Sequence, residues 1–230
     1  MLYTRQNAVE NIRNRDGKRV FYLGKGDQLT SDAKDWLHSQ RIEILPSEQA
    51  KPDRWRLLGG GFCEEKPEHM THLNGEILVS KTHPRIAFRG TMDTLEAELL
   101  LCQQQTGESR LGDILEMART LLRCDVLEEP VPDKPLCGML QDELRSRSHF
   151  PQKYYNQPHF MPSTGDSQTV LLLNRVRCFA RAAELAAVHA FSDREGNPTR
   201  VDILRALNRM SSMIYLLMIE HKAKHIDMDN

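Results

Sequence analysis

The chain lacks a long apolar run, a secretory signal and a strong net charge. No run of about 18 apolar residues occurs in its 230 residues, so we expect no transmembrane helix and no membrane partner. The first 19 residues are polar throughout, which predicts a cytoplasmic location. A net charge of −1 gives no electrostatic footprint for nucleic acid. Apolar residues still make up 40% of the chain, which is enough for the core of a globular protein.

Cysteines are few and widely spaced. None of the five forms a C-x-x-C pair or a cysteine–histidine pattern typical of a metal site. We therefore interpret them as reduced thiols, as in most cytoplasmic proteins. Cys102 and Cys124 fall within helical apolar patterns, where they are expected to be buried as small hydrophobic residues.

Residues 1–60 are expected to form a small α/β region. Its predicted elements are a strand at 20–23, a turn at 24–28, a helix at 32–39 and a strand at 41–45. Thr30 or Ser31 is positioned to cap the helix. The polar stretch 46–54 is expected to be a linker, and the glycines 59–61 a flexible break.

The remainder, residues 61–230, is predicted to be a bundle of about five helices, which makes the fold class mainly α. The predicted helices begin at about 88 and about 111 and then cover 137–147, 167–191 and 200–222. The segment 149–166, rich in proline, tyrosine and histidine, is expected to be a long functional loop. Thr199 and Asp202 form a T-x-x-D capping pattern before the last helix.

Polar residues gather on one arc of each of the last two predicted helices. At about 100° per residue, Arg177, Arg181 and Glu184 share a narrow arc of a helix that has no plainly solvated face. The corresponding arc of the last helix consists of Arg205, Asn208, Arg209 and Ser212. Buried charges must be paired or face a ligand. The pattern therefore indicates either a salt-bridge network between helices or a binding site.

A basic segment precedes the first long helix. It reads Lys81-Thr82-His83-Pro84-Arg85 and follows the apolar stretch 77–79. Basic groups just ahead of a helix N-terminus suit an anion, although a solvated basic turn would have the same sequence. A second run follows at 89–96, Arg-Gly-Thr-Met-Asp-Thr-Leu-Glu.

Taken together and in order, these segments resemble the ATP:corrinoid adenosyltransferases. That family has K-x-D-P-R…G-T-x-D-E-L, then R-x-x-x-R-x-x-E on a long helix, then L-N-R-L-S-D on the last helix. Here the matching stretches are 81–85, 90–95, Arg177 to Glu184 and 207–212. Thr71-His72-Leu73 and the N-terminal region resemble the ethanolamine-utilisation branch of the family.

The chain departs from the family pattern at several positions. The Gly-rich phosphate loop T-x-x-G-D-x-G is missing, and His83, Glu96 and Ser212 replace a common acid, asparagine and aspartate. Where many members of the branch have a C-C-x-x-C metal cluster, only Cys63 is found. A lone thiolate cannot complete a tetrahedral site, so no soft-metal cluster is expected.

The resemblance implies transfer of the 5′-deoxyadenosyl group of ATP to the cobalt of reduced cobalamin. It implies catalytic roles for Arg177, Arg181, Glu184 and Asp93, and ATP binding by Thr71, His72, Lys81, Arg85, Asn208 and Arg209. Lys81, Arg177 and Arg181 would stabilise the leaving triphosphate together with Mg²⁺, for which Glu184 is a candidate ligand. Asp93 would pair with Arg177, within the subunit or across a subunit boundary. Arg209 would contact phosphate or brace the site.

The predicted loop carries the candidate corrin contact. His159-Phe160-Met161-Pro162 resembles the F-x-x-P loop of the family, offset by one residue, and implies that Phe160 covers the lower corrin face. The alternative is that Phe160 anchors the loop to the core. The histidines at 149, 159, 189 and 221 have no ligand spacing, so we interpret them as surface or core-edge residues.

The resemblance also implies partners and a setting. ATP and a corrinoid would be the substrates, and the chain would form a homo-oligomer, with a trimer favoured. Ethanolamine utilisation is the expected pathway, with a link to a metabolic microcompartment. Two alternatives remain open at this point: a corrinoid carrier that has lost ATP chemistry, and a purely structural helical bundle.

Overall fold

The computed structural model describes residues 1–15, 17–47 and 55–228. Two compact units can be distinguished: Met1–His83 with Asp125–Glu128, and Pro84–Cys124 with Glu129–Asn230. This division differs from the boundary expected at about residue 60. The reason is strand pairing, because β6 (Trp55–Leu57) runs parallel to β9 (Ile77–Ser80) in one sheet. A cut at residue 60 would separate these paired strands.

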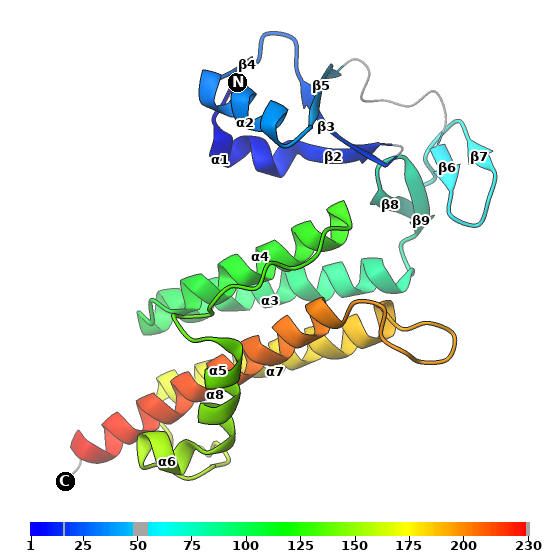
Figure 1. The fold of residues 1–230 in the computed structure, drawn as a ribbon. Helices are drawn as coiled ribbons and strands as arrows, with labels where there is room; N and C mark the ends of the chain where they lie inside the picture. Colours follow the sequence, from blue (N-terminus) through cyan, green and yellow to red (C-terminus); the bar gives the residue numbers. More distant parts are fainter. Residues whose placement is uncertain (16, 48–54, 229–230) are drawn as a thin grey trace. The chain divides into compact units, whose positions relative to one another are not determined.

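The first unit is built from small sheets and short helices (Figure 1). β1 (Leu2–Tyr3) pairs with β4 (Gln28–Leu29), and β3 (Lys18–Leu23) lies between β2 (Ile12–Arg15) and β5 (Glu43–Pro46). The third sheet has the order β7 (Phe62–Cys63), β6, β9 and β8 (Met70–Asn74). The remaining elements are α1 (Arg5–Ala8), the 3₁₀ turn η1 (Val9–Asn11) and α2 (Ser31–Ser39).

The predicted α/β elements of this unit are confirmed. β3, α2 and β5 follow the expected strand, helix and strand, and Thr30 Oγ1 accepts a hydrogen bond from the Ala33 amide at 3.2 Å. The glycine run is not a flexible break but the turn between β6 and β7. Gly60 and Gly61 have φ values of 98° and 85°, a region that favours glycine. Most of the predicted linker, 48–54, lies outside the described residues.

The second unit is mainly helical. Its four long helices are α3 (Pro84–Thr106), α4 (Leu111–Leu127), α7 (Gln168–Ala190) and α8 (Val201–Met228), and two short ones are α5 (Gln141–His149) and α6 (Pro151–Tyr155). Helix α7 packs against both α3 and α8 (Figure 1). The apolar periodicity of the sequence forms the core, in which Met92, Leu95 and Leu99 are fully buried. Cys102 and Cys124 are buried as expected.

Two local predictions in this unit are wrong, and a third is not confirmed. The helix expected at 137–147 begins only at Gln141, because Cys137 and Gly138 have positive φ and belong to a turn. The segment 149–166 contains α6, so the expected number of about five helices is not confirmed. Thr199 does not cap α8; its hydroxyl donates to the Phe191 carbonyl at 2.8 Å instead. Among the described residues, no helix is long and apolar enough to cross a membrane.

The sequence predicts that helix α7 is packed on all sides, but the structure leaves one of its faces exposed. Its inner face is buried, with Val176, Ala180 and Ala183 at 1% exposure or less. Leu185 on the opposite face is 72% exposed, and Val188 is 44% exposed. The small and apolar residues that suggested burial on every side therefore leave one apolar face uncovered in the single chain.

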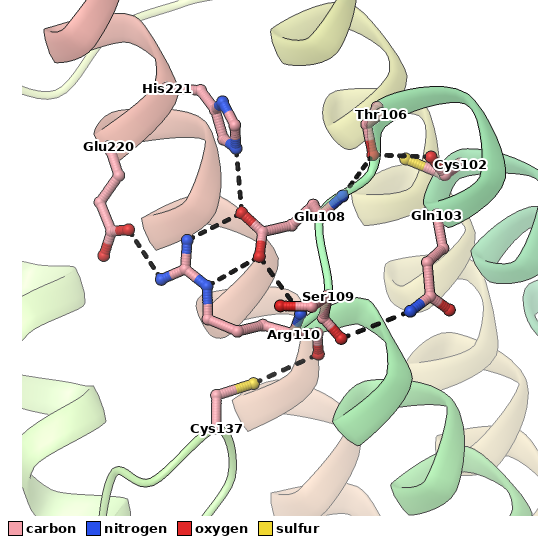
Figure 2. Close-up of polar contacts among 9 residues, drawn as sticks. All are labelled: Cys102, Gln103, Thr106, Glu108, Ser109, Arg110, Cys137, Glu220 and His221. Carbon is pink, nitrogen blue, oxygen red and sulfur yellow. Dashed lines mark hydrogen bonds and ion pairs between the residues drawn. The ribbon is translucent and has the colours of Figure 1, made fainter.

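A polar cluster joins the α3–α4 loop to the last turns of α8 (Figure 2). The Glu108 carboxylate accepts hydrogen bonds from the Arg110 guanidinium at 2.8 and 2.9 Å and contacts His221 Nε2 at 3.0 Å. Arg110 also pairs with Glu220 at 2.7 Å. These bonds, with Arg110 as the strongest cause, lower the pKa of Glu108 to about 2. The cluster fixes the loop to α8 through charged groups that are largely removed from solvent.

Replacing Glu108 with glutamine is expected to lower the free energy of unfolding by about 2 kcal/mol at pH 7, because Arg110 loses its charged partner. The folded pKa of Glu108, about 2, lies below its ordinary value. Its contribution is therefore fully present above about pH 5 and is lost as the pH falls towards 2. Urea unfolding followed by circular dichroism should show the difference between wild type and variant shrinking over that range. Glu116→Gln, at an exposed position of α4, is the control. A difference independent of pH would contradict this account.

Candidate functional site

A cleft of about 540 Å³ lies in the second unit, and its walls come from α7 and α8. We call it the α7–α8 cleft. It is lined by Ser148 and His149 at the end of α5, by the loop residues His159, Phe160, Met161 and Pro162, by Arg177 and Arg181 of α7, and by Asn208, Ser211, Ser212, Tyr215 and Met218 of α8. The described lining contains two arginines and no carboxylate, so the cleft suits an anion.

Two of the three arginines of α7, Arg177 and Arg181, have no acidic partner among the described residues. Arg181 is exposed, and no described carboxylate lies within ion-pair distance of it or of Arg177. The Arg177 guanidinium instead lies 5.1 Å from the centre of the Tyr215 ring, a cation–π contact. Arg175, only two residues earlier, pairs with Glu98 of α3 at 2.7 Å. The α7 arginines of the predicted arc therefore do not form the salt-bridge network that was the alternative interpretation.

Glu184 and Asn208 connect the two helices. The Asn208 side-chain amide donates to Glu184 Oε1 at 3.1 Å. Glu184 therefore orients an amide, and within the described chain it pairs with neither arginine. Both residues belong to the polar arcs of the last two helices, but a contact between them was not predicted from the sequence.

Tyr215 holds the loop that carries Phe160. Its hydroxyl accepts from the Phe160 amide at 3.2 Å and contacts His159 Nδ1 at 3.1 Å. His159 Nε2 lies 3.2 Å from the His149 carbonyl, which can only accept, so this nitrogen carries the proton. In neutral His159, Nδ1 then accepts from the Tyr215 hydroxyl. The Tyr215 hydroxyl thus donates to one ring nitrogen and accepts from one backbone amide, and both bonds attach the loop to α8.

A second attachment closes the same loop. Asp166 accepts from the Ser163 amide at 2.7 Å and forms an ion pair with Lys222 of α8. The hydrogen bond from Lys222 is the largest cause of the lowered pKa of Asp166. The Lys222 ammonium lies 4.7 Å from the centre of the Phe160 ring. Phe160 packs against the core, as in the alternative that it anchors the loop, and it also lines the cleft.

Arg209 and Arg205 do not line the α7–α8 cleft. They line a separate cavity of about 140 Å³ with residues of the segment 131–144. Consecutive residues of a helix point about 100° apart, and Asn208 and Arg209 contribute to different cavities. Burial, together with the positive charges of Arg145 and Arg205, lowers the pKa of Arg209. The polar arc predicted on α8 is thus divided between two cavities.

Two further predicted residues lie on α3. Asp93 is exposed and forms no ion pair with a described residue, so its predicted pairing with Arg177 is absent within the chain. Arg85 is half-buried in the first turn of α3. No group of three or more histidine, cysteine, aspartate or glutamate side chains in the described part of the chain is arranged to hold a metal ion.

The profile of the family described as "Cobalamin adenosyltransferase" matches residues 62–221, which is more than half of the chain. This chain belongs to the cobalamin adenosyltransferase family.

Similar proteins carry related names. The chain is 35% identical over 210 residues to "Corrinoid adenosyltransferase EutT" of Salmonella typhimurium, covering 90% of this chain and 78% of that protein. It is 34% identical over 224 residues to the protein of the same name in Escherichia coli, covering 86% and 84%. A solved structure of a variant PduO-type ATP:corrinoid adenosyltransferase from Lactobacillus reuteri, complexed with cobalamin and ATP, has 17% identity, a TM-score of 0.48 and coverages of 79% and 90%.

The remaining predicted residues of this cobalamin adenosyltransferase family member belong to the first unit. Thr71 and His72 lie on β8, and exposed Lys81 follows β9. The His72 ring packs edge-on against Trp55, with 4.6 Å between ring centres. Burial, then the charges of Lys66 and Arg13, lower the pKa of His72, so its ring is neutral at pH 7. We therefore expect His72 to act as a hydrogen-bonding group and not as a cation.

Sequence reasoning missed several residues of the cleft. His159 and His149 are exposed, as expected for surface residues, but both also line the cleft. Tyr215 was not singled out, although it contacts His159, Phe160 and Arg177. The signal for Tyr215 was weak, because it stands within the apolar stretch of α8 and only its hydroxyl distinguishes it from core residues.

Proposed function

We propose that this chain transfers the 5′-deoxyadenosyl group of ATP to the cobalt of reduced cobalamin, forming adenosylcobalamin. One observation of the site carries the proposal: Arg177 and Arg181 line a cleft and have no acidic partner among the described residues. A cleft wall with two cations and no described carboxylate attracts an anionic ligand. Membership of the cobalamin adenosyltransferase family, and the relatives named corrinoid adenosyltransferases, support this chemistry.

The proposed step is a displacement at C5′ of ATP. Cobalt(I) supplies both electrons of the new Co–C bond, the C5′–O5′ bond breaks, and triphosphate leaves with that electron pair. The protein need not supply a nucleophile, so its tasks are positioning and stabilisation of the leaving group. Arg181 and Arg177 are the proposed contacts for the triphosphate. Their positive charge offsets the charge that develops on its bridging oxygen.

Asn208 is the proposed hydrogen-bonding partner of the nucleotide, held in place by Glu184. Mg²⁺ is usually bound by one or two carboxylates together with substrate phosphates. Glu184 fits as one such ligand, because its carboxylate adjoins the cleft through Asn208. Bound with ATP, the ion would add positive charge at the phosphates. Arg209 is not part of this site, because it lines a different cavity.

Phe160 is the proposed contact for the lower corrin face. Its backbone amide is fixed by Tyr215, and its ring lies between Tyr215 and Lys222. A ring that lines a cleft and is held by its neighbours can cover a corrin face and exclude water. In this role, Tyr215 and His159 act as positioning residues for the loop.

The remaining predicted residues extend the proposal. Lys81, Thr71, His72 and Arg85 would contact ATP, taking over part of the role of the missing Gly-rich loop. We further propose a homo-oligomer, with a trimer favoured, in which Asp93 pairs with Arg177 of a neighbouring subunit. Exposed apolar residues on α3 and α7, such as Leu100, Leu101 and Leu185, offer a face for such contacts.

The proposed pathway is ethanolamine utilisation, supported by the identity to the proteins named EutT. A cytoplasmic location, with association with a metabolic microcompartment, goes with this proposal.

A spectrophotometric assay tests the function directly. Purified protein with ATP and chemically reduced cobalamin should form adenosylcobalamin, and omission of ATP should abolish the product. Calorimetry under reducing conditions gives the second measurement. Cobalamin binding without any ATP binding would indicate a corrinoid carrier and not an enzyme. If neither ligand bound, the chain would be a purely structural helical bundle.

A further inference from the structure

We propose that the cavity beside Arg209 is a second binding site, built for a short-chain aliphatic carboxylate. Its lining combines a cationic side with an apolar side. The residues are Met117 of α4, Val131, Pro132, Asp133, Lys134, Leu136 and Met139 of the segment leading into α5, Gln141 and Leu144 of α5, and Asp202, Arg205, Ala206 and Arg209 of α8. This inference goes beyond adenosyl transfer and does not depend on it.

Arg209 provides the recognition group. Its side chain is half-buried, and its Nε atom is buried without a hydrogen-bond partner among the described residues. A buried N–H without a partner is costly, so such a group in a folded protein requires a reason. The Nε–H and one terminal N–H of a guanidinium point in the same direction and match the two oxygens of a carboxylate. Arg209 lines the cavity and forms no ion pair with a described acid, so a carboxylate in the cavity would meet a guanidinium whose charge is not yet paired.

None of the described acids around the cavity forms an ion pair with Arg209. Asp202 is occupied by Arg200 and by the Val131 amide, both at 2.9 Å, and Asp133 accepts from Gln141 at 2.8 Å. Asp142 acts on Arg209 through its charge but forms no described ion pair with it. Meanwhile Arg205 and Lys134 also line the cavity, and the charge of Arg145 acts on Arg209. The lining thus holds three cations and two carboxylates, and because Asp202 is already paired with Arg200, the lining keeps a net positive charge.

The apolar side determines the class of anion. Met117, Leu136, Met139 and Leu144 offer no hydrogen bonds. A phosphate would have to leave several oxygens unpaired against them, whereas a carboxylate needs only the guanidinium and can place an alkyl tail on the apolar side. Cavities of about 150 Å³ hold a molecule the size of benzene, and this cavity measures about 140 Å³. Butyrate is of similar size.

Titration with sodium butyrate by calorimetry tests the site, using the full chain without ATP and sodium chloride to hold the ionic strength constant. Butyrate should bind wild type more tightly than acetate does, because acetate lacks the tail, and more tightly than inorganic phosphate. Arg209→Met, which keeps the apolar stem, should weaken butyrate binding at least about 10-fold through loss of the charge-assisted pair. Ala206→Leu, which fills the cavity and keeps both arginines, should weaken it similarly. The exposed Arg194→Met is the control and should bind as wild type does.

Thermal unfolding without ligand separates binding from a structural role. If Arg209 serves a ligand, Arg209→Met should keep or raise the unfolding midpoint, because a half-buried charge without a partner is removed. A clear fall in the midpoint, with butyrate affinity unchanged in the remaining folded protein, would overturn the proposal. So would the absence of butyrate binding to wild type. Phosphate binding tighter than butyrate would overturn the assignment to a carboxylate.

Discussion

Replacing Arg181 with methionine is expected to lower kcat/KM for adenosyl transfer about 100-fold or more, with the helical circular dichroism unchanged. Arg181 is exposed in the cleft and has no described ion-pair partner, so its loss leaves no buried acid unpaired and should not unfold the protein. Removing one group that stabilises developing charge typically costs a factor of about 100 to 1,000. Arg177→Met should have an effect of similar size, because its charge lies on the same wall of the cleft.

A matched control is available on the same helix. Arg175 is also an exposed arginine of α7, but it pairs with Glu98 and does not line the cleft. Arg175→Met should therefore change kcat/KM less than about 3-fold, at a cost in stability of up to about 1 kcal/mol. The measurement is the rate of adenosylcobalamin formation at varied ATP concentrations. If Arg175→Met and Arg181→Met lowered kcat/KM equally, the total positive charge of α7, and not the position of Arg181 in the cleft, would support the reaction.

Removal of the Tyr215 side chain is expected to give the second large effect. Tyr215→Leu loses both contacts to the loop and the ring beneath Arg177, so we expect kcat to fall about 100-fold, as small displacements in an active site can do. Stability should also fall, by about 3 kcal/mol. Tyr215→Phe keeps the ring and loses only the hydroxyl, and kcat should fall about 10-fold with little change in the KM for ATP.

The comparison of Tyr215→Leu with Tyr215→Phe distinguishes the effect of positioning the Phe160 loop from the effect of lower protein stability. Tyr154→Phe is the control, because the Tyr154 hydroxyl bonds to Ser146 outside the cleft. The spectrum of protein-bound cobalamin gives an independent reading, since a displaced Phe160 loop should reduce the fraction of corrinoid that has lost its lower axial ligand. If Tyr215→Phe kept wild-type kcat and an unchanged spectrum, the hydroxyl would have no positioning role.

Part of this site could be predicted because it lies on regular helices. Arg177 and Arg181 are four residues apart on α7, and helical geometry alone puts them on one wall. Asn208 follows from the same periodicity on α8 and from the motif in which it stands. The core could be predicted as well, because Met92, Leu95 and Leu99 repeat at helical spacing, and all three are fully buried.

The rest depends on contacts that no local pattern encodes. His159 and Tyr215 meet across 56 residues of chain, and His221 meets Glu108 across 113. The start of α5 was misplaced because Cys137 adopts a positive φ that is rare for a residue other than glycine. A helical wheel presents the polar arc of α8 as one surface, because it does not show where one cavity ends and the next begins.

The adjacency of Asn208 and Arg209 has a consequence for how this chain can change in length. Each of the two residues faces its own cavity, and the rotation between them is set by the helix. A single residue inserted or deleted earlier in α8 would turn one of the packed parts of the helix by about 100° relative to the other. That change would displace Asn208 from the arginines of α7 and Arg209 from its cavity at the same time. Length variation among natural relatives should therefore be confined to the loops that flank α8, while substitutions within it can alter either cavity separately.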